Sequence, residues 1–254
     1  IAKPSTPCSR IKVKNPFISL KDAISKTAES PIMEYLFWGI PMGPSVTLLA
    51  ARAKAGKTIA CENLALALVD EGCNEFLGLD IATVNKVAIL SFEEALVNRT
   101  QRQIKQTRAY VAASNTKTPV DEKIFVLDTD YYQFLADDKQ RNELLASLQA
   151  LSPDVVFIDS LGRLAVGQIE DSSFSQQLML YLRHMAFTLN CPIIVLHHTV
   201  KAKKSDSVEL SSMAGSRVLA QESDAVFTIV EGYNPGERII KPLAFRYSGD
   251  DNAD

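Results

Sequence analysis

The segment Leu48–Leu68 contains the side chains most able to do chemistry, because Gly56, Lys57 and Thr58 follow one another inside it. A phosphate-binding loop has the template G-x-x-x-x-G-K-[ST], in which the lysine reaches the β and γ phosphates and the hydroxyl ligates Mg²⁺. Here the first glycine of the template is replaced by Ala51. The residues therefore predict a site for a nucleotide and Mg²⁺ that departs from the template at its first position.

The residues on either side of this segment fit a phosphate loop. The apolar run Val46–Ala50 ends at the loop, and a helical pattern starts at Thr58. Loop N–H groups and a helix N-terminus give partial positive charge to phosphates. Gly56 lets the backbone approach a ligand closely, and Ala51 costs some turning freedom. A chance Gly-Lys-Thr in an alanine-rich helix is the alternative. The predicted nucleotide-binding residues are Ala51, Arg52, Ala53, Lys54, Ala55, Gly56, Lys57, Thr58 and Ile59.

Asp159 ends the apolar run Val155–Ile158, where a buried strand would not otherwise tolerate a charge. At the carboxyl end of a parallel strand it would face the phosphate loop and act on Mg²⁺ through water. The alternative is an aspartate that caps the following turn.

Glu93 and Glu94 follow another apolar strand. A general base that polarises the attacking water should lie at a neighbouring strand end, and Glu93 is the first choice, with Glu94 second. Alternatively, both carboxylates begin a helix, because acidic residues favour the first turn.

These side chains must be positioned by alternating strands and helices. Short β-branched runs alternate with longer amphipathic stretches, which predicts βαβ units and an α/β fold with a mainly parallel sheet. The predicted strands cover 45–50, 86–92, 123–128, 154–159, 192–198 and 225–230, with a last one near 239–247. The predicted helices cover 20–28, 57–71, 95–113, 138–151 and 173–190.

Length and composition indicate one large domain. The chain has 254 residues, 46% of them apolar, and a formal charge of −3. Residues 1–29 are rich in Lys, Ser and Pro and are predicted to form an arm or linker, and residues 30–254 the domain. An acidic chain does not bind nucleic acid through its whole surface, so any such contact must be local.

The four cysteines lack metal-ligand spacing, which favours reduced thiols and a cytoplasmic location. No apolar run reaches the ~18 residues that a membrane span requires, and no signal peptide is visible. Because the chain begins with Ile1, we expect it to be part of a longer protein.

Over residues 30–250 the chain resembles RecA-like P-loop ATPases, specifically the RepA-type hexameric replicative helicases (AAA_25-like), with features shared with DnaB-type helicases. The fold implied is a mainly parallel central sheet with helices on both faces. Ala51 followed by Arg52 also occurs in DnaB-type helicases, so we expect a working ATP site. Five segments carry the resemblance: WGIPMGPSVTLLA, EFLGLDIATVNKVAILSFEE, PDVVFIDSLGRLAVGQIEDSS, PIIVLHHTVKAKK and MAGSRVLAQESDAVFTI.

The resemblance assigns roles to matching residues. Lys57 would bind phosphate and Thr58 would ligate Mg²⁺. Glu93 would act as the general base, and Asp159 would contact Mg²⁺ through water. His198 matches a polar sensor at the end of the fifth strand, where a structural histidine is the alternative. His197 is expected to point to the other face.

In the family, basic residues of a neighbouring protomer complete the site at a subunit interface. The segment KPLAFRYSGD offers Arg246 as this arginine finger, with Lys241 as second candidate. An arginine on an exposed strand is the alternative. Arg217 stands where the RepA-type motif more often has serine.

In RecA-like rings the loops after the fourth and fifth strands line the central channel. Here they offer Arg163 in the first loop and Lys201, Lys203 and Lys204 in the second. These residues suit non-specific contact with single-stranded DNA, and a solvated charge cluster is the alternative.

Three functions follow from these motifs. The first is an ATP-driven hexameric motor that translocates on single-stranded DNA as a helicase in replication of a plasmid or mobile element. The second is a regulatory ring ATPase of the KaiC kind, in which the Ser-Phe-Glu-Glu segment resembles paired catalytic glutamates. The third is a nucleotide-binding interaction module without useful hydrolysis.

Overall fold

The computed structural model describes residues 18–28, 34–128, 138–164, 172–199, 217–234 and 236–247. The chain forms two compact units, Ile1–Met33 and Glu34–Asp254. The first unit contains helix α1 (Leu20–Thr27), which begins where the Ser19 hydroxyl accepts a hydrogen bond from the Asp22 N–H at 3.0 Å. The remaining described elements belong to the second unit.

A seven-stranded sheet forms the centre of the second unit, in the order β11-β10-β3-β9-β8-β6-β7. Adjacent strands in it run parallel except β10 and β11, which are antiparallel. The mainly parallel sheet predicted from the sequence is therefore confirmed. Its strands are β3 (Ser45–Ala51), β6 (Val87–Ser91), β7 (Ile124–Val126), β8 (Val155–Asp159), β9 (Pro192–His198), β10 (Ala225–Glu231) and β11 (Arg238–Phe245).

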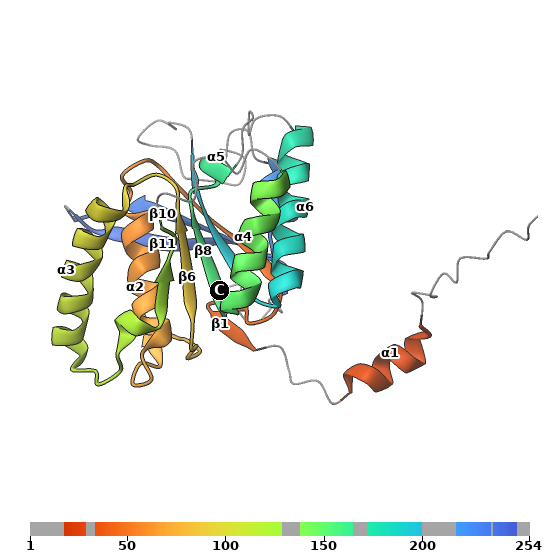
Figure 1. Cartoon of the computed structure of the whole chain (residues 1–254), viewed down its shortest axis with the longest axis horizontal. Helices are drawn as coiled ribbons and strands as arrows, with labels where there is room; N and C mark the ends of the chain where they lie inside the picture. The colour runs from red at the N-terminus through yellow and green to blue at the C-terminus, as the bar shows by residue number, and fades with distance from the viewer. Residues whose placement is uncertain are drawn as a thin grey trace, which may run out of the picture. The chain divides into compact units, whose positions relative to one another are not determined.

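Helices cover both faces of this sheet, with α2 and α3 on one face and α4 and α6 on the other (Figure 1). Each long helix lies within two residues of its predicted range at either end. The long helices are α2 (Lys57–Val69), α3 (Leu96–Ser114), α4 (Asp138–Leu151) and α6 (Ser172–Leu189). The short helices α5 (Leu161–Leu164) and α7 (Arg217–Glu222), with a 3₁₀ turn at Val120–Glu122, were not predicted.

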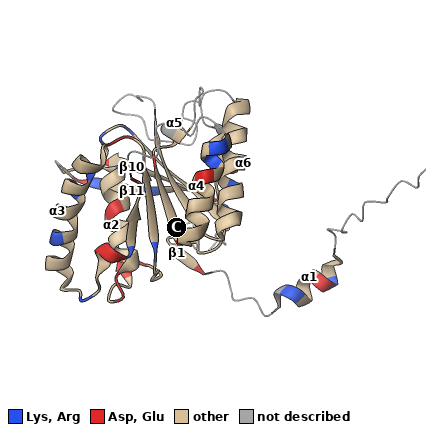
Figure 2. Ribbon diagram, viewed as in Figure 1, with Lys and Arg blue, Asp and Glu red and all other residues tan. Residues whose placement is uncertain are grey.

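The core consists of two apolar clusters, one on each side of the sheet. Along β3, Leu48 and Ala50 belong to the cluster under α4 and α6, whereas Leu49 and Ala51 belong to the cluster under α2. This alternation is the period of two expected for a strand that is buried on both faces. Accordingly, the central strands carry almost no charge along their length (Figure 2).

Two short hairpins were also not predicted. They are formed by β1 (Tyr35–Phe37) with β2 (Ile40–Pro41), and by β4 (Glu75–Phe76) with β5 (Leu79–Asp80). The second hairpin turns at Leu77 and Gly78, with φ of 55° and 80°. Asn-Gly or Asp-Gly is the usual signal for such a turn, and leucine gives no such signal in the sequence.

The parallel topology aligns the carboxyl ends of β3, β9, β8 and β6 along one edge of the sheet. Among the described residues, those predicted to act on ATP and Mg²⁺ lie at or just after one of these ends, except Arg246, which follows β11. Among the described helices, none has both the length and the apolarity needed to cross a bilayer.

Candidate nucleotide-binding site

The phosphate loop connects β3 to α2 and uses left-handed backbone at Lys54 and Gly56, where φ is 64° and 94°. Ala51 is instead the last residue of β3, buried and paired with His198 of β9. Since its backbone is extended rather than left-handed, alanine replaces the template glycine there without conformational strain. Gly56 precedes α2 and has no side chain to cap it, so the first-turn N–H groups remain for an anionic ligand.

Lys57 is only 4% exposed and is held inside the loop. Its Nζ donates to the carbonyl oxygens of Ala51 and Arg52, both at 2.9 Å, and lies 3.1 Å from His198 Nδ1. Burial lowers the pKa of this ammonium group, and the negative charges of Asp159 and Glu93 oppose that shift. The loop thus confines one positive charge that phosphate oxygens would compensate better than carbonyl groups do.

Thr58 and Asp159 form the second contact of the site. The Thr58 hydroxyl donates to Asp159 Oδ2 at 2.6 Å, and Asp159 is 6% exposed. Burial raises the pKa of the Asp159 carboxyl, and the hydrogen bond from Thr58 partly offsets this.

This oxygen pair fits Mg²⁺, which usually keeps several water ligands and is held by one or two carboxylates together with substrate phosphates. Within the described part of the chain, no group of three or more His, Cys, Asp or Glu side chains could hold a metal without such help. Thr58 and Asp159 would hold the ion beside the phosphate loop.

His198 joins the phosphate lysine to the predicted base. Because a lysine ammonium group can only donate, His198 Nδ1 accepts from Lys57 and carries no proton. The proton is then on Nε2, which donates to Glu93 Oε1 at 3.0 Å and lies 3.3 Å from Oε2. The Ser160 hydroxyl also donates to Glu93. Two donors thus fix the Glu93 carboxylate, which stays 34% exposed and accessible to water.

Glu93 therefore reaches the site from further away than expected, since β9 and β8 lie between its strand β6 and β3. His198, at the end of β9, spans this gap. His197 is buried and His198 is more exposed, consistent with the alternation predicted for this strand.

Glu94 points to a different partner, the guanidinium group of Arg102 on α3. Arg102 also bonds the buried Glu62 of α2 through Nε at 3.1 Å and Nη2 at 2.8 Å. Neither Glu93 nor Glu94 lies in the first turn of α3, which begins at Leu96. The two adjacent glutamates thus have separate environments in the loop before that helix.

Arg246 lies near the amino ends of the parallel strands, opposite the carboxyl ends that carry the phosphate loop. Ala225, the first residue of β10, pairs with Thr47 of β3 and with Phe245, the last residue of β11. The side chain of Arg246 reaches the buried Asp224, with Nε 3.4 Å from Oδ1. The predicted role as a finger for a neighbouring protomer's site stays a prediction.

The residues predicted to contact nucleic acid stay predictions as well. Lys201, Lys203 and Lys204 lie outside the described residues. Arg163 belongs to α5, directly after the strand that carries Asp159, and its side chain also lies outside the description.

Three residues near the site were missed from the sequence: Ser160, Glu62 and Arg102. Ser160 had a positional signal, since it follows Asp159 at the strand end. Glu62 lies one turn after Thr58 on the same face of α2, where a charged residue among apolar ones was a weaker signal. Nothing in the sequence paired Glu62 with Arg102, which is 40 residues away.

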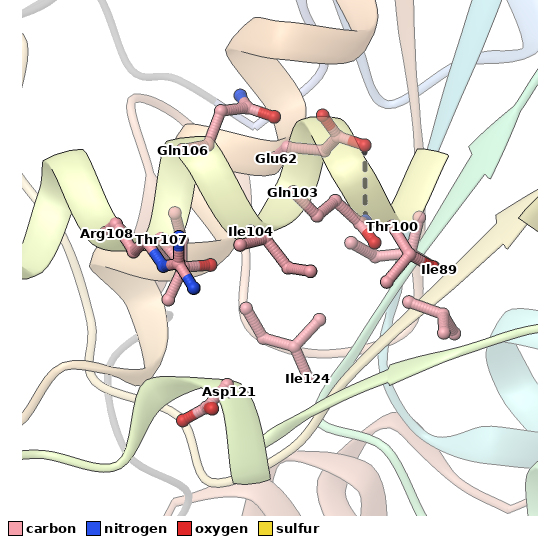
Figure 3. Close-up of a pocket in the computed structure, with 12 residues that line it drawn as sticks. Glu62, Ile89, Thr100, Gln103, Ile104, Gln106, Thr107, Arg108, Asp121 and Ile124 are labelled. Carbon is pink, nitrogen blue, oxygen red and sulfur yellow. Dashed lines mark hydrogen bonds between the residues drawn. The ribbon is translucent and has the colours of Figure 1, made fainter. Parts of the chain in front are cut away.

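A separate groove of about 400 Å³ lies between α2, α3 and the edge strand β7. Its walls include Leu66, Ile104 and Ile124, with Glu62 and Gln103 at one side (Figure 3). Lys57, Asp159 and Glu93 do not line it. The groove is therefore distinct from the phosphate site.

Comparison with known protein families shows which family the chain belongs to. Residues 15–204, well over half of the chain, match the family model AAA_25, described as an AAA domain. The chain belongs to this AAA domain family. No curated protein matches the sequence.

Two solved structures show that the fold of this AAA domain is shared more widely. The crystal structure of the RadB recombinase is 16% identical, with a TM-score of 0.51, and the match covers 81% of this chain and 83% of that one. A second structure, described as an ATPase domain, is 15% identical, with a TM-score of 0.59, and the match covers 91% of this chain and 92% of that one. The predicted fold class, a RecA-like P-loop ATPase fold, is confirmed.

Proposed function

We propose that this chain hydrolyses ATP with Mg²⁺ and works as a motor subunit, with residues 30–254 as the ATPase domain. The observation that carries the proposal is the chain of contacts from Lys57 through His198 to Glu93. It connects the residue that would bind phosphate to the residue that would activate water. A site that only bound nucleotide would have no need for this connection.

Each side chain has a distinct task in this reaction. Lys57 and the N-terminus of α2 would bind phosphate oxygens, and Thr58 and Asp159 would hold Mg²⁺, which would neutralise developing phosphate charge. Glu93 orients a water molecule and accepts its proton. The Nε2–H of His198 and the Ser160 hydroxyl hold that carboxylate in place. When Lys57 turns to a phosphate, His198 loses its donor, so nucleotide binding is transmitted to Glu93.

The finer proposal is a hexameric ring that translocates on single-stranded DNA in replication of a plasmid or mobile element. It rests on the resemblance of the ordered motifs to RepA-type helicases. Arg246 would act on the site of the adjacent protomer, at an edge remote from its own phosphate loop. Lys201, Lys203 and Lys204, with Arg163, would contact the DNA backbone.

The test is steady-state ATP hydrolysis with and without single-stranded DNA, for the wild type and Lys57→Ala. We expect a rate that rises with DNA, and a loss of about 10²-fold or more in the variant, because a contact to the transition-state charge is removed. Mant-ATP binding separates loss of affinity from loss of turnover.

The other outcomes identify other functions. A slow, Lys57-dependent rate that is indifferent to DNA, with ATP-linked ring assembly, would contradict the motor and favour a regulatory ring ATPase of the KaiC kind. Nucleotide binding without hydrolysis would contradict both and favour an interaction module.

A further inference from the structure

We propose that Arg102 is a positioning residue for ATP hydrolysis, which it serves by fixing the loop that carries Glu93 to the helix that follows the phosphate loop. This inference rests on the proposed ATPase function. It assigns Glu94 as an anchor of that loop instead of a second base.

The contacts of Arg102 span three elements. Its Nη1 pairs with Glu94 in the β6–α3 loop, while Nε and Nη2 bond both oxygens of Glu62 on α2. Gln103 adds a donor to Glu62 at 3.2 Å (Figure 3). Together they give Glu62 three donated hydrogen bonds and tie Glu94 to the same guanidinium group.

Stability alone explains this arrangement poorly. The Glu62 side chain is only 5% exposed, and burying an ion pair usually gives little net stability over an apolar pair of the same shape. The hydrogen bonds to Glu62 raise the pKa of Arg102, so the guanidinium stays charged at any physiological pH. A two-bond contact between a guanidinium group and a buried carboxylate instead defines position.

The contacts of Arg102 lie next to both the predicted Mg²⁺ residues and the predicted base. Glu62 is one helical turn after Thr58, and both residues line a small cavity together with Asp159. Glu94 adjoins Glu93 in the chain, so holding its side chain restrains the backbone on one side of the base. Ser160 and His198 restrain the Glu93 carboxylate itself. Arg102 therefore links the metal side of the site to the base.

The alternatives to this role are that Arg102 only joins α2 to α3, or that Glu94 is itself a base. Variants at Glu94 distinguish them. Glu94 is about one-third exposed, so we expect its replacement to leave the buried Glu62 pair intact and the protein folded. Gln keeps an acceptor for Arg102 but cannot accept a proton, and Ala keeps neither.

The experiment compares kcat, KM, mant-ATP affinity and Tm for the wild type, Glu94→Ala, Glu94→Gln and Arg102→Met. We expect kcat to fall about 10- to 100-fold in Glu94→Ala, the loss typical of a misplaced catalytic group, with KM and Tm little changed. Glu94→Gln should stay within about threefold of the wild type, and Arg102→Met with Glu94→Ala should be no slower than Arg102→Met alone.

Lys123→Met is the matched control, because it breaks another ion pair between elements, with Glu71 at 2.7 Å. It should leave kcat unchanged. Wild-type kcat in Glu94→Ala, or equal losses in Glu94→Ala and Glu94→Gln, would overturn the inference. Absence of hydrolysis by the wild type would instead overturn the proposed function.

Discussion

At the scale of single residues, the site contains two charges that the fold destabilises. Burial lowers the pKa of Lys57 and raises that of Asp159, so folding disfavours the charged form of each. The negative charges of Asp159 and Glu93 near Lys57, and the hydrogen bond from Thr58 to Asp159, compensate only in part. A nucleotide and Mg²⁺ would compensate both charges, so binding free energy is gained where folding free energy is lost.

Asp159→Asn should therefore stabilise the protein without ligands. Asn keeps an acceptor for the Thr58 hydroxyl and removes the buried charge, and we expect the free energy of unfolding to rise by roughly 0.5–2 kcal/mol at pH 7. The raised pKa means that Asp159 destabilises the fold little below its ordinary pKa of 3.8 and more as pH rises through the raised value. The advantage of Asn should accordingly grow as pH rises from 3.8 to the raised pKa of Asp159, and stay constant above it.

Denaturant unfolding from just below pH 3.8 to pH 8 measures this effect, and Mg²⁺-dependent mant-ATP affinity measures the loss of binding in the same variant. A less stable Asp159→Asn protein at pH 7 would contradict the account of the site.

Much of the site was predictable from the sequence, for a physical reason. Lys57, Thr58, Asp159 and Glu93 stand where apolar strands end, and parallel strands bring such ends to one edge. The link through His198 depended on strand order, which puts β9 beside both β3 and β8. The separation of Glu93 from Glu94 depended on Arg102, whose partners are set by helix packing that a single sequence does not encode locally.

At the scale of elements, the phosphate loop uses its left-handed conformations away from the missing glycine. The strand β3 continues through Ala51, and the backbone turns at Lys54 and Gly56. The sequence template treats the first glycine as the turning residue, so from the sequence alone Ala51 is expected to cost turning freedom. The short hairpins were missed for a similar reason, because Trp38 and Leu77 occupy left-handed positions without being typical turn residues.

Ala51→Gly should consequently improve neither the stability of the protein nor its affinity for ATP. A glycine in a strand loses more backbone entropy on folding than alanine does, so we expect destabilisation of about 0.5–1 kcal/mol and an unchanged KM for ATP. Gly56→Ala is the paired variant. A Cβ there meets no atom within 4 Å, so the effect reports conformation alone.

We expect Gly56→Ala to destabilise the protein by about 1–2 kcal/mol, the usual cost of a left-handed alanine, and to weaken ATP binding. Thermal unfolding and mant-ATP titration of the two variants test the pair. Tighter ATP binding by Ala51→Gly would show that the template glycine is needed after all.

At the scale of the whole molecule, the parallel sheet separates two sets of residues. The carboxyl ends of the parallel strands carry Lys57, Asp159, Glu93 and His198. Arg246 lies near the amino ends of these strands, beside Asp224. An arginine so placed cannot complete the site of its own subunit. Its proposed role therefore requires a second copy of the chain, in agreement with the ring proposed above.

Arg246→Ala should keep nucleotide affinity and lose hydrolysis by about 10³-fold, the lower range for arginine fingers. Mixing it with Lys57→Ala should restore activity, because some interfaces then combine an intact phosphate loop with an intact Arg246. Each variant alone is the control. A mixture no more active than its components would contradict a role in trans.

The central claim is that Glu93 activates water in an ATPase site, and Glu93→Gln tests it most directly. Single-turnover hydrolysis and mant-ATP binding should be measured on the same preparation. We predict unchanged or tighter ATP binding and a loss of hydrolysis of at least about 10²-fold, because Gln keeps the hydrogen bonds but cannot accept a proton. Hydrolysis by Glu93→Gln at the wild-type rate would contradict the account.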